Sequence, residues 1–146
     1  MNNYVPTPLL VCEVIQEAQK KKKKEAKIKV LKDNESWALK DILRGSYDNT
    51  VKWNIPDSKP PYTPNIGHST PSNFLKLNTQ LKYFVAGGQG DAMQKAKREQ
   101  LFIQLLESID PEDAELLCGM IQKKEITGVK RNVVEEAFPG LLLDAQ

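Results

Sequence analysis

The spacing of apolar residues in the C-terminal half constrains the fold more than any other feature of this sequence. Within residues 101–109, apolar side chains recur at positions 101, 102, 105, 106 and 109, which is the period of an α-helix. Asp110 and Pro111 follow directly. Aspartate is a preferred N-cap and proline is tolerated at the first helical position, so this pair ends one helix and begins another. The sequence therefore predicts two consecutive helices joined by a tight turn.

The same helical period recurs on both sides of this pair. The helix after Pro111 has an apolar stripe, and a last short helix with a second stripe lies between the turn Thr127-Gly128 and Pro139-Gly140. These stripes are Ala114, Leu117, Cys118 and Ile121, then Val133, Val134, Ala137 and Phe138. Toward the N-terminus we expect helices over residues 8–19, 24–32, 35–47 and 72–86. Ser72 is the expected cap of the last one, and either Trp37 or Ala38 the expected core residue of the third.

These patterns predict an all-α fold, in which an orthogonal multi-helix bundle forms a single domain over residues 1–146. Only residues 51–55 show a short strand-like alternation. No heptad persists across the breaks between segments, which argues against a long coiled coil. A chain of 146 residues is enough for one ordinary core.

A proline-rich segment, residues 48–71, interrupts the helices as a long loop. Its five prolines cannot propagate a helix. Trp53 and Tyr62 could stack on nucleic-acid bases, but aromatic residues in long loops more often pin the loop onto the core, and we favour pinning. His68 also lies here. A single histidine without neighbouring cysteines or patterned carboxylates predicts no metal site.

Composition and the N-terminus favour a cytoplasmic protein. No run of about 18 apolar residues could span a bilayer, and residues 1–6 lack the features of a secretory signal. Cys12 and Cys118 lie among apolar helical neighbours, so we expect reduced core thiols rather than a disulfide or a reactive site.

The charge is distributed unevenly. Residues 20–32 contain eight lysines and one glutamate, a net charge of +7, whereas the rest of the chain has 13 basic and 18 acidic residues, a net charge of −5. A run of like charges is most often a solvated helix start or loop. Contact with phosphates or with an acidic partner is the alternative.

The sequence contains no recognisable catalytic constellation. The nucleotide-binding, zinc-protease, C-x-x-C and serine-hydrolase motifs are all missing, so we expect neither enzymatic activity nor a cofactor. The loop Gly87-Gly88-Gln89-Gly90 reads either as a helix C-cap and turn or as a phosphate-binding loop. The basic helix start that follows favours the second interpretation, because backbone amides and cations could together bind one anion. Those cations are Lys95, Lys97 and Arg98.

The order of these motifs resembles the helical N-terminal DNA-binding domain of ATP-dependent DNA ligases, especially the short bacteriophage form. The likeness includes the glycine loop, the basic helix, the Asp-Pro-Glu-Asp-Ala start at 110–114, the turn at Gly128 and the ending at 138–141. It extends over nearly the whole chain apart from the proline-rich segment. The chain is also similar to small tailed-phage proteins with W-N-x-P, P-P-Y-x-P and L-F-I-x-L-L-E strings, here at 53–56, 60–64 and 101–107.

The resemblance implies that two loops grip the minor groove of duplex or nicked DNA. Gly88, Gln89, Gly90 and Lys97 would fall in the first loop, and Thr127, Gly128, Val129 and Lys130 in the second. The chain departs from the ligase pattern in lacking the K-x-D-G lysine of nucleotidyl transfer, so no adenylation is expected. It also has Thr127 where many ligases place an arginine, a loss for which Lys130 and Arg131 could compensate.

Two functions remain open from the sequence. The first is a non-enzymatic module that binds the DNA backbone without reading sequence. The phage resemblance implies that it is encoded by a phage and acts in the host cytoplasm. The second is an adaptor that kept the fold and lost the DNA grip, presenting the proline-rich loop or an acidic run to a viral or host protein. That run is Glu107, Asp110, Glu112, Asp113 and Glu115.

Overall fold

Helices make up the framework of the protein. The computed structural model describes residues 8–66 and 71–145. Seven α-helices lie within these ranges: α1 (Val11–Lys20), α2 (Lys24–Asp33), α3 (Trp37–Tyr47), α4 (Phe74–Leu77), α5 (Lys95–Ser108), α6 (Pro111–Ile121) and α7 (Arg131–Ala137). Three 3₁₀ helices accompany them: η1 (Asn78–Tyr83), η2 (Gln89–Ala92) and η3 (Leu143–Ala145). No strand forms in the described ranges, so the predicted all-α class is confirmed.

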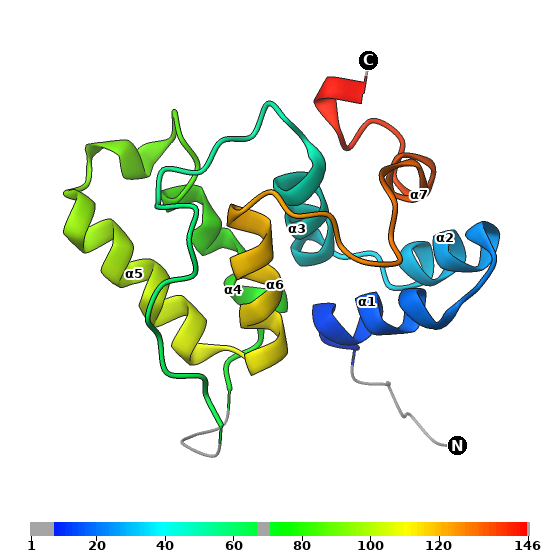
Figure 1. The fold of residues 1–146 in the computed structure, drawn as a ribbon, viewed down its shortest axis with the longest axis horizontal. Helices are drawn as coiled ribbons and strands as arrows, with labels where there is room; N and C mark the ends of the chain where they lie inside the picture. The colour runs from blue at the N-terminus through cyan, green and yellow to red at the C-terminus, as the bar shows by residue number, and fades with distance from the viewer. Residues whose placement is uncertain (1–7, 67–70, 146) are drawn as a thin grey trace, which may run out of the picture.

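The helices cross one another rather than running parallel (Figure 1). Helix α6 stands near the middle with α3 beside it, α5 and η1 lie on the left, and α1, α2 and α7 lie on the right. Helix α6 packs on α1, α3 and α5, and α2 packs on α1 and α7.

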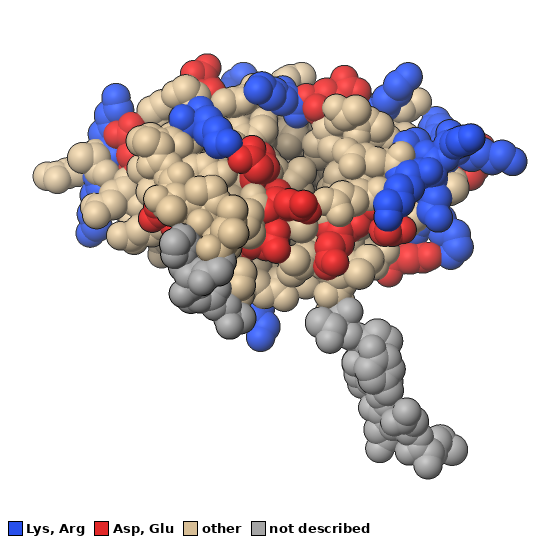
Figure 2. Space-filling model, turned by 60° about the horizontal axis from the view of Figure 1, so that its bottom comes forward, with Lys and Arg blue, Asp and Glu red and all other residues tan. Residues whose placement is uncertain are grey.

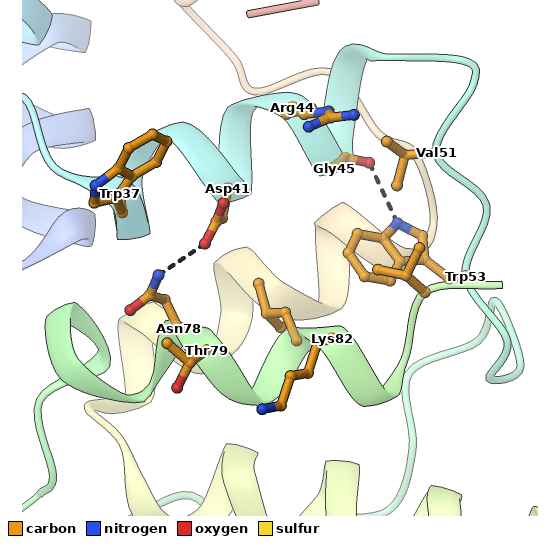
Figure 3. Close-up of a pocket in the computed structure, with 11 residues that line it drawn as sticks. Trp37, Asp41, Arg44, Gly45, Val51, Trp53, Asn78, Thr79 and Lys82 are labelled. Carbon is orange, nitrogen blue, oxygen red and sulfur yellow. Dashed lines mark hydrogen bonds between the residues drawn. The ribbon is translucent and has the colours of Figure 1, made fainter. Parts of the chain in front are cut away.

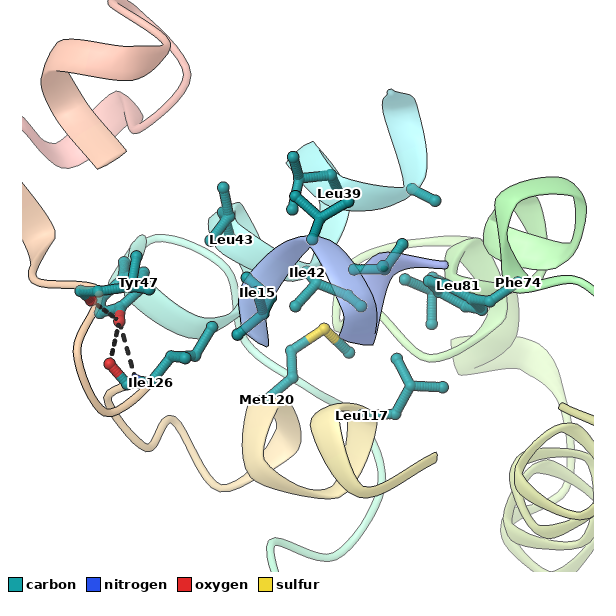
Figure 4. Packing of buried hydrophobic residues seen from close by; sticks show 14 of the residues in the cluster. Ile15, Leu39, Ile42, Leu43, Tyr47, Phe74, Leu81, Leu117, Met120 and Ile126 are labelled. Atoms are coloured by element: carbon teal, nitrogen blue, oxygen red, sulfur yellow. Dashed lines mark hydrogen bonds between the residues drawn. The ribbon is translucent and has the colours of Figure 1, made fainter. Parts of the chain in front are cut away.

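The core forms where α1, α3, α4 and α6 meet (Figure 4). The predicted stripe of α6, from Ala114 to Ile121, is buried, as is that of the last helix. Leu39, Ile42 and Leu43 of α3 are completely buried. Each such aliphatic side chain contributes roughly 1.5–3 kcal/mol when removed from water, so this junction is the main source of stability.

The N-terminal helices begin and end close to the predicted residues. Helix α3 starts at Trp37 because the Ser36 hydroxyl accepts a hydrogen bond from the backbone N–H of Leu39 at 3.1 Å, as an N-cap does. Of the two alternative core residues, Ala38 is completely buried, while the Trp37 side chain is 73% exposed. The asparagine after α2, Asn34, closes that helix by donating its side-chain amide to the Val30 carbonyl.

The prediction of one helix over residues 72–86 was wrong. The N–H of Ser72 donates to the carbonyl of Ser108 at 2.6 Å, which holds Ser72 in an extended bridge outside the helix. The side chain of Asn73 is the cap instead, accepting from the N–H of Leu75 at 2.9 Å. One short turn, α4, follows, and the chain then tightens into η1.

The proline-rich loop is pinned to the body, as favoured from the sequence. The Trp53 indole donates to the Gly45 carbonyl at 3.2 Å, and the Tyr62 hydroxyl bonds to Glu115 at 3.2 Å. Both rings pack against the core. His68 lies outside the described residues. The two cysteines are both buried, as expected of core thiols, and are not joined to each other.

Candidate functional site

The lysine run forms a basic edge of the molecule, defined here as Lys20–Lys24 together with Lys27 and Lys130. Lys20 ends α1, Lys24 begins α2, and residues 21–23 connect them with exposed side chains. Figure 2 shows Lys and Arg gathered at the right-hand end, where Figure 1 places the α1–α2 connection. Acidic side chains occupy the middle of the same face.

The second predicted loop lies against this edge. The Lys27 ammonium donates to the Gly128 carbonyl at 2.7 Å and to the Ala18 carbonyl at 3.2 Å. The Gln19 amide donates to the Thr127 carbonyl at 2.8 Å. From the other side, the buried Tyr47 hydroxyl accepts from the N–H of Ile126, and burial raises the pKa of Tyr47 to about 12. These contacts fix residues 126–130 beside the α1–α2 connection.

A cavity of about 400 Å³ opens between the lysine run and α7. It is lined by Lys22, Lys24, Lys27, Gly128, Lys130, Asn132 and Val133. Lys24 is paired with Glu136 at 2.6 Å. The side chains of Lys22 and Lys130 make no ion pair or hydrogen bond with any residue in the described ranges, so both ammonium groups remain available to an anion.

The glycine loop, by contrast, binds a carboxylate of its own chain. The N–H of Gly87 donates to Asp91 Oδ2 at 2.7 Å, and the Asn54 amide donates to Asp91 Oδ1 at 2.9 Å. The hydrogen bonds from Asn54 and Gly87 hold the pKa of Asp91 below its usual range. Gly90 is required by close approach, because a Cβ there would lie 1.6 Å from the Tyr83 carbonyl oxygen.

The sequence predicted that the glycine loop leads into the basic helix start, but η2 lies between them. Residues 89–94 separate Gly88 from α5, so the loop does not lead directly into that helix. Gln89, Lys95 and Lys97 are exposed. Arg98 turns inward and donates to backbone carbonyl oxygens of Asn54, Gly90 and Met93 at 2.9, 3.1 and 2.9 Å.

Arg131 also has partners within the protein. It donates to Glu135 at 2.8 Å and to the Tyr47 carbonyl at 2.7 Å, and it is paired with Asp144. The Arg131 guanidinium holds the pKa of Asp144 down to about 2. Arg98 and Arg131 thus hold loops in place, whereas the unpaired lysines leave their charges open to solvent.

A second cavity, of about 370 Å³, lies between α3 and η1 (Figure 3). Trp37 stands at one end and Trp53 at the other. In the floor between them, Asp41 accepts from the Asn78 amide at 2.8 Å, and burial raises the pKa of Asp41. Arg44 extends from α3 at the upper edge and Lys82 from η1 at the lower edge.

Sequence reasoning missed that the lysine run and the second loop converge. Lys27 and Gly128 are 101 residues apart in the chain. No local motif reports such a contact. The density of lysines marked the run, and the ligase resemblance marked the second loop, but neither signal joined the two.

The described chain is thus all-α and carries a localised basic surface. The family model that matches residues 14–127 is described as a family of unknown function, DUF6433, and the chain belongs to this family. No curated protein and no solved structure matches the chain. Among the described helices, none is both long and apolar enough to cross a membrane.

Proposed function

We propose that the protein is a non-enzymatic module that binds the backbone of duplex DNA through the basic edge. The observation that carries this proposal is the cavity at which the lysine run meets the second ligase-like loop. Four lysines line it, and two of them, Lys22 and Lys130, have no internal partner. Phosphate contacts of this kind position a protein on nucleic acid without reading the base sequence.

The resemblance to ligase DNA-binding domains supports the same proposal. In that mode the second loop, with Thr127, Gly128 and Lys130, meets the DNA backbone. The lysine run lies beside this loop and adds to its positive potential. The first loop contributes less here, because its Gly87 amide and the Arg98 guanidinium are bound within the protein. Lys95 and Lys97 remain exposed on that side.

Fluorescence anisotropy with labelled DNA tests the proposal. At about 50 mM salt the full-length protein should bind intact and nicked duplexes, and a ligase-like grip should favour the nicked one. Charge reversal in Lys22→Glu with Lys130→Glu should weaken binding at least about tenfold, since two contacts become repulsive. Incubation with labelled ATP should leave no covalent adenylate. Absence of binding to either duplex, or an unchanged affinity in the double variant, would refute the proposal.

The cavity beside Trp37 favours one other candidate, a protein-binding adaptor. An exposed tryptophan at the end of a groove is the kind of anchor that dominates protein interfaces. The proline-rich loop and the acidic run are less suited to this role, because they bind each other. Glu115 pairs with Lys59 at 2.6 Å, and Glu107 accepts from the N–H of Thr63 at 2.7 Å.

The two candidates respond differently to one substitution. Trp37→Ala should leave DNA affinity unchanged within about twofold if the basic edge carries function, because Trp37 does not line its cavity. The adaptor candidate requires instead that the wild-type protein fails to bind DNA and that Trp37→Ala abolishes a protein interaction.

A further inference from the structure

The first turns of α1 and α6 bring a thiol and carboxylates together. Cys12 Sγ, a carboxylate oxygen of Asp110 and one of Glu112 all lie within 4.8 Å of one another. The Cys12 thiol donates to Asp110 Oδ1 at 3.8 Å across a separation of 98 residues. Three potential metal ligands from two helices are therefore already close enough to share one ion.

A fourth group behind them has an unsatisfied atom. Asp113 is completely buried, and its Oδ1 accepts from the N–H of Cys12 at 2.8 Å. Its Oδ2 is also buried and has no hydrogen-bond partner in the described ranges. Leaving such an oxygen unpaired costs roughly 1–3 kcal/mol. The bond from the Cys12 N–H places this carboxyl directly next to Cys12.

The cluster is accessible from solvent through a small cavity. A space of about 220 Å³ is lined by Cys12, Gln16, Glu112 and Glu115, together with three neighbours from α1 and α6. Glu112 and Glu115 are exposed at its opening. The acidic middle of the face in Figure 2 gives an approaching cation a favourable potential.

The donor set selects the kind of cation. Mg²⁺ and Ca²⁺ prefer oxygen ligands alone, whereas Zn²⁺ accepts cysteine sulfur together with aspartate or glutamate oxygen in four-coordinate sites. We propose that Cys12, Asp110 and Glu112, with Asp113 next to Cys12, bind one divalent cation of the zinc class. On binding, the metal–sulfur bond replaces the S–H bond and the thiol proton passes to solvent.

Such an ion would tie the start of α1 to the start of α6. Sequence reasoning predicted no metal site because it considered the single histidine and local spacing only. The ordinary alternative is that Asp110 serves only as the helix cap, since its Oδ1 accepts from the N–H of Glu112 at 2.9 Å. The experiment must therefore separate capping from metal binding.

Cobalt(II) provides the probe, because a thiolate bound to Co²⁺ gives a charge-transfer band in the near ultraviolet. Titration of the full-length, reduced protein should produce this band. Added Zn²⁺ should remove it by displacement, and Mg²⁺ or Ca²⁺ should not. The band requires a thiolate, so binding by other side chains would not produce it.

Four variants assign the band to the cluster. Cys12→Ser should lose it, and Cys118→Ser, a matched change at the other buried cysteine, should keep it. Asp110→Asn retains a good N-cap but removes the charge, so the fold should survive while Co²⁺ affinity falls at least about tenfold. The Co²⁺ affinity of Glu112→Gln should fall by a similar factor. A circular dichroism spectrum of each variant checks that it remains helical.

Three results would overturn the proposal. The first is no band at any Co²⁺ concentration. The second is a band that survives Cys12→Ser or vanishes in Cys118→Ser. The third is an affinity unaffected by both Asp110→Asn and Glu112→Gln, which would leave Asp110 as a helix cap alone.

Discussion

The glycine loop and the basic edge both have the composition of an anion site, yet they satisfy their polar groups differently. In the glycine loop the backbone amide of Gly87 binds Asp91, and Arg98 binds three carbonyl oxygens. At the basic edge, Lys22 and Lys130 face a cavity with no internal partner in the described part of the chain. The same residue types therefore stabilise the fold in one region and remain available to a ligand in the other.

This contrast has an energetic basis. A guanidinium bonded to three carbonyl oxygens is worth more to folding than a solvated lysine, because removing it leaves those acceptors unsatisfied. An exposed ammonium contributes little to stability but keeps its full charge for phosphate. Substitutions in the first region should therefore change stability, and those in the second should change binding.

The largest expected effect is from Gly90→Ala. Its Cβ would lie 1.6 Å from the Tyr83 carbonyl oxygen, so the backbone of the loop must move. We expect the free energy of unfolding to fall by about 3 kcal/mol or more, measured by urea denaturation. Gly119→Ala in α6 is the control. Apart from its chain neighbours and the backbone of its own helix, nothing lies within 4 Å of the added methyl group, and the change should stabilise by about 0.5–1 kcal/mol.

A smaller loss is expected from Arg98→Met, which keeps the length of the side chain and removes its donors. The variant should lose about 2 kcal/mol of unfolding free energy, because hydrogen bonds from a charged group to three carbonyl oxygens disappear. Lys97→Met, at the exposed neighbouring position, should stay within about 0.5 kcal/mol of wild type. Equal losses in the two variants would remove the distinction between internal and available cations.

The next effect concerns pH. Asn54 and the Gly87 N–H hold the pKa of Asp91 below its usual range, so the folded state binds the proton more weakly than the unfolded state does. This contribution is present above the ordinary carboxyl range and is lost as pH falls through it. Asp91→Asn should therefore lower stability at neutral pH and flatten its decline between about pH 5 and pH 2.

Asp57→Asn in the proline-rich loop provides the control for that experiment, since Asp57 is exposed. The free energy of unfolding is compared as a function of pH. If it falls in parallel for the wild type and Asp91→Asn over the acid range, Asp91 does not serve as the internal anion of the glycine loop.

Helices with strong local signals were predictable from the sequence. Asp110 caps α6 and Pro111 occupies its first turn, as predicted. Both preferences depend only on residues close by in the chain, so the sequence reports them directly. The fourth helix was not predictable in the same way. Ser72 has the chemistry of a cap, but its N–H bonds to the Ser108 carbonyl 36 residues away in an extended bridge, and the helix begins one residue later with Asn73 as its cap. Long-range hydrogen bonds override local preference at that position.

The candidate site was predictable only in part. Charge density marked Lys22 and its neighbours, and the ligase resemblance marked Gly128 and Lys130, but neither signal indicated that these residues share a cavity. The glycine loop had the stronger motif. Its Gly87 amide is bound by Asp91, a residue whose role depends on the fold of residues 54–91 rather than on spacing.

The salt dependence of DNA binding tests the central claim most directly. Each lost phosphate contact lowers the magnitude of the slope of log K against log salt by about 0.9. The triple variant Lys22→Gln, Lys23→Gln, Lys130→Gln should lower it by about 2.7. The variant Lys82→Gln, Lys95→Gln, Lys97→Gln removes the same charge near the glycine loop and should change the slope by less than about 1. Equal slopes in the two variants, or a larger change in the second, would contradict the assignment of binding to the basic edge.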